Sequence, residues 1–190
     1  MKKKTVALLL ALVLVFGVAA GGTLAWLTAQ TSEVKNTFTY GDINIELTET
    51  TSGYKVVPGA TDSKDPTIKV TAGSEKCYVY AKVENTVKMD GTVVATPNIN
   101  AGNWILVGEK DDVKLYRYKT VVDAAKAEAQ LSVFTEVSYA DTITKDKIAA
   151  VAGGQITITA YAHQSEYTNQ GTADAAAIDW AGVTAVTPTT

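Results

Sequence analysis

The sequence predicts an all-β protein, an antiparallel β-sandwich that is jelly-roll-like or, as the alternative, immunoglobulin-like, with few short helices. Two observations carry this prediction. Past residue 33, apolar and polar residues alternate with the period of a strand that has one buried face. Glycine, proline and aspartate separate these runs, and no helical pattern is long enough to organise a fold.

The expected strands follow one another along the chain with turn residues between them. They cover residues 38–47, 66–70, 77–84, 104–107, 113–118, 131–137 and 156–162. The first of these ranges is either a strand pair or one bulged strand around Gly41-Asp42. The clearest is 77–84, in which Cys77, Val79, Ala81 and Val83 share one face. Asp90-Gly91 and Asp111-Asp112 are hairpin-type turn signals. Weaker patterns predict short helices over 123–129, 144–151 and 173–180.

The N-terminus reads as a secretory signal. Lys2, Lys3 and Lys4 precede an apolar run over 6–20, and small residues follow it. We expect cleavage by a signal peptidase between Ala25 and Trp26. Removing 25 of the 190 residues, with three lysines and no acidic residue, leaves 165 residues with 14 basic and 20 acidic side chains, a net charge of −6.

An uncleaved membrane anchor is the alternative reading of the same segment. No charged residue occurs between Lys4 and Glu33, a stretch of 28 residues, whereas about 20 apolar residues span a bilayer. The resulting division is a signal peptide over 1–25, an N-terminal extension over 26–35, a sandwich domain over 36–182 and a frayed tail over 183–190. Membrane association through the signal is expected to be transient.

Composition argues against several classes of function. The whole chain has 17 basic and 20 acidic residues with a single arginine, which leaves no basic surface for nucleic acid. One histidine and one cysteine are too few for the usual zinc sites or for an internal disulfide. We therefore assign no cofactor, no metal ligand and no catalytic residue.

Each remaining candidate has an ordinary structural interpretation. His163 lies on the polar side of its strand, where a solvated residue is favoured over a general base. Cys77 lies on the inward face, as a small buried residue rather than an interchain disulfide. The acidic pairs Asp62 with Asp65 and Asp111 with Asp112 fit solvated turns better than a calcium loop.

Tyrosines occur in two pairs, each placed on one sheet face. Tyr78 pairs with Tyr80, and Tyr116 pairs with Tyr118. Such faces suit sugars or a partner protein, but packing between strands is their commoner role.

The chain resembles the TasA/camelysin family of secreted Gram-positive proteins, in particular its clostridial-type, alternate-signal exported members. The resemblance begins where the signal meets the first strand and continues in order along most of the chain. Its segments are Gly21 to Thr28, Val34 to Thr39, Ile43 to Leu47, Tyr54 to Gly59, Lys64 to Pro66, Cys77 to Val79, Asn103-Trp104, Tyr116 to Tyr118, Leu131 to Thr135 and Ala160 to Gln164.

The resemblance implies a signal peptide processed by a SipW-type peptidase and a jelly-roll-like sandwich at the cell surface or in the biofilm matrix. It also implies a structural, fibre-forming role, with self-association or other matrix proteins as partners. Camelysin-type relatives are catalogued as metallopeptidases, so a surface metallopeptidase is one alternative. A module that binds polysaccharide or protein is another. With one histidine and no zinc motif, an enzyme is not expected.

Assembly has a physical route that does not depend on the family. Open sheet edges carry unpaired N–H and C=O groups that accept a strand from another chain. Cleavage after Ala25 frees residues 26–34, which lack proline and glycine and offer Trp26, Leu27 and Val34 as anchors. We expect this segment either to add to a neighbouring subunit or to pair within its own domain.

Overall fold

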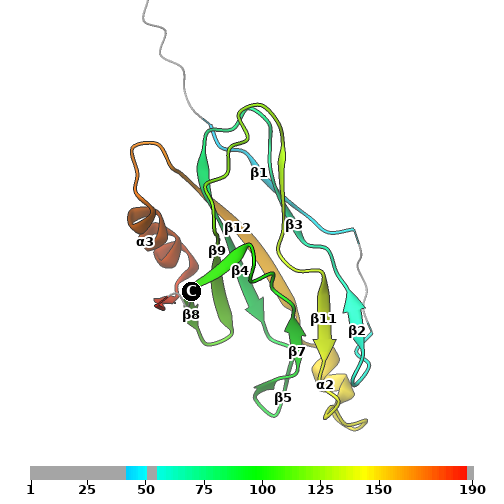
Figure 1. Ribbon diagram of the computed structural model, residues 1–190. Helices are drawn as coiled ribbons and strands as arrows, with labels where there is room; N and C mark the ends of the chain where they lie inside the picture. The colour runs from blue at the N-terminus through cyan, green and yellow to red at the C-terminus, as the bar shows by residue number, and fades with distance from the viewer. Residues whose placement is uncertain (1–41, 51–54, 188–190) are drawn as a thin grey trace, which may run out of the picture. The chain divides into compact units, whose positions relative to one another are not determined.

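The computed structural model describes residues 42–50 and 55–187, which form a sandwich of two antiparallel layers (Figure 1). This confirms the predicted fold class. The expected cleavage point between Ala25 and Trp26 and the strand anchors Trp26, Leu27 and Val34 lie outside the described residues. Within the described residues, no helix is long and apolar enough to cross a membrane.

One layer is a five-stranded sheet with long central strands. Its order is β12 (Ile156–Gln164), β4 (Cys77–Asn85), β9 (Val113–Tyr118), β8 (Trp104–Lys110) and β13 (Thr184–Ala185). β4 and β12 pair over nine residues, from Cys77 opposite Gln164 to Asn85 opposite Ile156. This pairing is the longest in the sandwich.

The other layer is made of two short sheets that continue each other. Their orders are β1 (Ile45–Thr48), β3 (Thr67–Val70), β10 (Ala129–Ser132) and β2 (Thr61–Ser63), β11 (Glu136–Tyr139), β7 (Ala95–Pro97). β2 leads into β3 and β10 leads into β11. Hydrogen bonds from Lys64 N to Thr135 O and from Val133 N to Pro66 O bridge the break, so the two sheets act as one layer.

The path of the chain is jelly-roll-like. After β3 it crosses to β4, returns to β7, crosses to β8 and returns again from β9 to β10, before β12 and β13 complete the five-stranded layer. Such repeated exchange between two sheets is typical of a jelly roll. A small hairpin of β5 (Lys88–Met89) and β6 (Thr92–Val93) lies outside the layers, with Asp90 and Gly91 at positive φ in its turn, as predicted.

The layers meet across an apolar core to which every long strand contributes. Strict alternation places Cys77, Val79, Ala81 and Val83 inside, as the sequence predicts. Trp104 of β8 joins the layers directly, because its indole Nε1 donates a 2.8 Å hydrogen bond to the carbonyl of Ser132 in β10. A buried indole needs such an acceptor, so this bond also fixes how the layers face each other.

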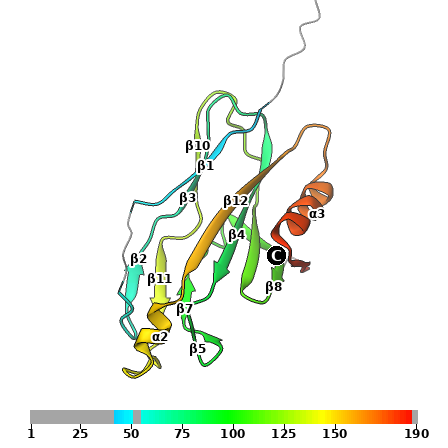
Figure 2. The same ribbon diagram turned by 180° about the vertical axis from the view of Figure 1, so that it is seen from behind.

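Two helices complete the fold of the described residues. α2 (Ile148–Ala152) places Val151 in the core at the end of the sandwich where β12 begins. α3 (Gln170–Ala181) covers the outer face of the five-stranded sheet, as Figures 1 and 2 show from opposite sides. Asn169 caps its N-terminus by accepting a hydrogen bond from Thr172 N, and Gly182 ends it with φ of +68°.

Four expectations about elements require correction. No helix forms over 123–129, and the strand expected over 131–137 is broken into β10 and β11, which lets Phe134 turn into the core. The last helix is longer than 173–180. The expectation that the chain frays over 183–190 does not hold at Thr184 and Ala185, because they pair with Glu109 and Gly108 of β8.

Replacing the cap of α3 should weaken the fold. We expect Asn169→Ala to lower the free energy of unfolding by about 1 kcal/mol, because the N–H of Thr172 loses its acceptor. Urea denaturation measures the change. Gln170→Ala, at an exposed position one residue later, is the control and should change stability by less than about 0.5 kcal/mol. Equal stabilities of the two variants would contradict the capping role.

Candidate functional site

The long edge strand β12 presents half of its backbone away from the sheet. Ser165 N donates to Lys76 O and Thr86 N donates to Gln155 O, so the odd-numbered residues of β12 bond to β4. The even-numbered residues then point their N–H and C=O groups outward. These residues are Ile156, Ile158, Ala160, Ala162 and Gln164. In the part of the chain that the structure describes, β4 is the one strand paired with β12.

The short edge strand β7 is closed to a further strand. Asn98 N bonds to Glu136 O, and this register turns Ala95 and Pro97 outward. Pro97 has no N–H to offer, and its carbonyl already accepts from Ile99 N. The carbonyl of Ala95 accepts a 2.7 Å hydrogen bond from Asn85 Nδ2. Proline and occupied carbonyls are usual protections of a sheet edge.

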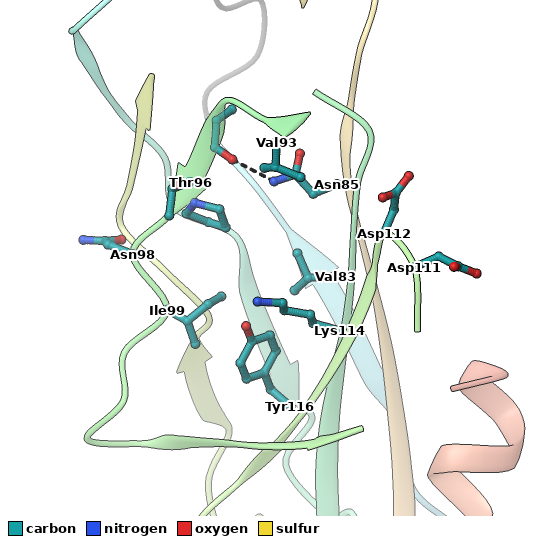
Figure 3. Close-up of a pocket in the computed structure, with 12 residues that line it drawn as sticks. Val83, Asn85, Val93, Thr96, Asn98, Ile99, Asp111, Asp112, Lys114 and Tyr116 are labelled. Carbon is teal, nitrogen blue, oxygen red and sulfur yellow. Dashed lines mark hydrogen bonds between the residues drawn. The ribbon is translucent and has the colours of Figure 1, made fainter. Parts of the chain in front are cut away.

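A cleft of about 440 Å³ opens between the two layers beside β7. It exists because β7 stops at Pro97, so the inward side chains near the start of β9 have no strand opposite them. Val83, Ala95 and Ile99 supply apolar walls. Figure 3 shows Lys114 and Tyr116 extending from β9 toward Ile99 across this space.

Charged side chains also line the cleft, namely Asp111, Asp112 and Lys114. Asp112 pairs with Lys88, whereas no carboxylate of the described residues lies within ion-pair distance of Lys114. Burial, with the nearby carboxylate of Glu109, raises the pKa of Tyr116. The cleft therefore has apolar walls, the amine of Lys114, which has no ion-pair partner among the described residues, and the neutral phenol of Tyr116.

A buried polar cluster fastens α3 to the sheet. Tyr80 donates a 2.8 Å hydrogen bond to Asp174 Oδ1, and Arg117 Nε lies 3.1 Å from the same oxygen. The Arg117 contact is ionic, because its angle does not meet hydrogen-bond geometry. Burial of the Tyr80 ring and its bond to Asp174 raise the pKa of its phenol. Ala173, Ala177 and Ala181 let the helix approach the sheet closely.

Aromatic side chains extend the contact between α3 and the sheet toward β12. Tyr161 stacks on Trp180 with 5.0 Å between ring centroids, and the Nζ of Lys82 lies 5.7 Å from the centroid of the Trp180 ring. The Tyr80 ring is fully buried under α3. The outer tyrosine face, one of the two considered for sugars or partners, is therefore a packing surface, whereas Tyr116 of the other pair lines the cleft.

The single histidine is half-buried near the end of β12. His163 Nδ1 lies 2.9 Å from the carbonyl of Gln164. Asp42 and Glu75 line the same shallow depression. Within residues 42–50 and 55–187, however, no three histidine, cysteine, aspartate or glutamate side chains lie close enough together to hold a metal ion.

Cys77 is a free and fully buried thiol on the inner face of β4. Burial raises the pKa of this thiol from 9.0 to about 11. The thiol is therefore protonated at neutral pH and is out of reach of another chain in the folded domain. This confirms the interpretation of Cys77 as a small buried residue.

The acidic pairs serve the turns around them. Asp65 accepts hydrogen bonds from the N–H and hydroxyl of Thr50, and Asp111 occupies the β8–β9 turn at φ of +53°. Asp62 is the exception, because its Oδ2 is buried without a hydrogen-bond partner. Nothing in the structure explains why this oxygen is buried without a partner.

Sequence reasoning missed the cleft and the polar cluster. The segment that contains Lys114 and Tyr116 alternates in polarity like any half-buried strand. Nothing in the sequence indicates that β7 ends too early to cover these two side chains.

Comparisons with protein-family models, with curated proteins and with solved structures gave no match.

Breaking the buried ion pair should cost more than any surface change on α3. We expect Asp174→Ala to lower the free energy of unfolding by about 3–5 kcal/mol, because Arg117 keeps its buried charge without a partner. Asp179→Ala, exposed on the same helix, is the matched control and should cost less than about 1 kcal/mol. A similar loss in both variants, measured by urea denaturation, would rule out the role of the pair.

Stability should fall in alkaline solution. Folding raises the pKa of Cys77 and Tyr80, so the unfolded chain releases these protons first. Stability is complete below about pH 9 and declines above it, by up to about 1.4 kcal/mol per pH unit for each group. Denaturation curves between pH 7 and 11 should show a shallower decline for Tyr80→Phe. Tyr167→Phe, which alters an exposed phenol, should leave the slope unchanged.

Proposed function

We propose that this protein is a secreted structural protein of the cell surface or biofilm matrix, and that it assembles into fibres by β-strand addition. The observation that carries the proposal is the contrast between two of the edge strands, β12 and β7. β12 has no proline or glycine and turns backbone groups outward at five alternate positions, of which the Gln164 carbonyl is contacted by His163 Nδ1, whereas β7 is closed by Pro97 and by occupied carbonyls. An open edge of this length is a template for another strand.

The N-terminal extension is the strand that we propose for this edge. Residues 26–34 have no proline or glycine, and they would be freed by cleavage after Ala25. Asp42, where the described residues begin, lies beside Ala162, His163 and Gln164 at one end of β12. The resemblance to the TasA/camelysin family supports the same surface role.

Deletion of residues 26–34 tests the proposal on protein recovered from the medium of expressing cells. We expect the deletion to abolish filaments seen by electron microscopy and to leave the urea midpoint of the monomer unchanged. If the segment instead pairs within its own domain, the deletion lowers that midpoint and does not alter the association state. Undiminished filaments would overturn the proposal.

A proline on the open edge gives an independent test. Ala160→Pro removes an N–H that points away from β4, so the pairing of β4 with β12 stays intact. We expect at least tenfold slower filament growth, followed by light scattering. Thr159→Ala, one residue away on the outer face, is the control and should grow at the normal rate. Normal growth of Ala160→Pro would exclude β12 as the acceptor.

A further inference from the structure

One tyrosine is fully exposed to solvent. Tyr167, in the loop between β12 and α3, is fully exposed at 102% of its reference area and has a φ of +60°. A bulky side chain in the left-handed region costs about 1–2 kcal/mol. Other large apolar side chains exposed in the described residues, such as Trp180 at 37%, are far more covered. Strain at an exposed aromatic residue indicates a role outside the domain.

Tyr167 and the cleft lie at opposite ends of the sandwich. Tyr167 follows Gln164, which pairs with Cys77 at one end of β4. The cleft is lined by Val83 and Asn85, and Asn85 pairs with Ile156 at the other end of β4. Eight steps along a strand separate these ends by roughly 26 Å. Figure 1 shows the loop before α3 and the β7 region at opposite ends.

The size of the cleft and one of its charged side chains suit the Tyr167 end of a second copy. The cleft of about 440 Å³ has room for one aromatic ring with its flanking backbone, and its walls are mainly apolar. Lys114, which lines the cleft, carries the charge opposite to that of the exposed Glu166 beside Tyr167. Asp111 and Asp112 line the cleft as well, and Asp112 is paired with Lys88. A projecting aromatic residue on one end and a matching pocket on the other make a head-to-tail contact that does not close on itself.

We infer that Tyr167 of one copy inserts into the cleft of a second copy, with Glu166 facing Lys114, and that this contact orients successive subunits end to end. The inference rests on the proposed fibre-forming function and adds a second interface to it. Strand addition supplies backbone hydrogen bonds along β12. The tyrosine contact fixes which ends meet.

The ring itself is tested with two substitutions of Tyr167 in the full-length coding sequence, on protein recovered from the medium. Tyr167→Ala and Tyr167→Gly should each weaken self-association at least tenfold in sedimentation experiments, although glycine removes the backbone strain. Equal loss in both variants assigns the effect to the ring. Association within twofold of the unaltered protein would overturn the inference.

The charge pairing is tested by exchange between two variants. Glu166→Lys and Lys114→Glu should each associate at least tenfold more weakly alone, because like charges then meet. An equimolar mixture should regain association to within threefold, because each variant then meets the opposite charge on its neighbour at both ends. Glu128→Lys and Lys126→Glu, both exposed elsewhere, are the matched controls and should associate normally.

The outcomes separate this inference from the proposed function. A mixture that associates no better than its components overturns the tyrosine contact, and the cleft is then open to another occupant such as a small molecule. If these variants leave filaments intact while deletion of 26–34 abolishes them, strand addition stands and the tyrosine contact falls. An unaltered protein that stays monomeric at all concentrations contradicts both.

Discussion

The nine-residue pairing between β4 and β12 is the constraint on which the other features depend. Its register decides that the even-numbered residues of β12 send their backbone groups outward, and it sets the distance between the two ends of the domain. A slip by one residue would turn Ile156 and Ile158 from the core to the solvent. The apolar face of β12 therefore fixes the geometry of its open edge.

β4 is covered on both faces, and the two coverings differ in kind. Inside, small apolar side chains meet the opposite layer across an ordinary core. Outside, Tyr80 meets a helix through a carboxylate that also faces Arg117. An ion pair of this sort adds little net stability over an apolar contact, because both charges lose their water. The cluster links α3 to both β4 and β9, because Tyr80 and Arg117 contact the same oxygen of Asp174.

Local patterns could be predicted from the sequence, and long-range contacts could not. The alternation of Cys77 to Val83 and the turn at Asp90-Gly91 depend on neighbouring residues, so both were predictable. Helix α3 was predicted too short, because Ala173, Ala177 and Ala181 face the sheet among further alanines that give no amphipathic contrast. Tyr80 and Asp174 are 94 residues apart, and nothing in either segment indicates the other.

The effect of the early end of β7 could not be predicted either, because it also depends on long-range contacts. Pro97 can be read in the sequence, but its effect on the cleft depends on which strand lies opposite, and only the packing of the layers determines that. The same distinction applies to the sheet edges. Proline in the sequence marks the closed edge at β7, whereas the open edge of β12 depends on its place in the order of strands.

The orientation of the β4–β12 pairing also has a mechanical consequence. The strands run between the two ends of the domain, so tension applied at those ends acts along them and perpendicular to their hydrogen bonds. All bonds of the pairing then bear the load together, in shear, instead of opening one after another like a zipper. A domain built in this way resists stretching along one axis far better than peeling of its outer helix.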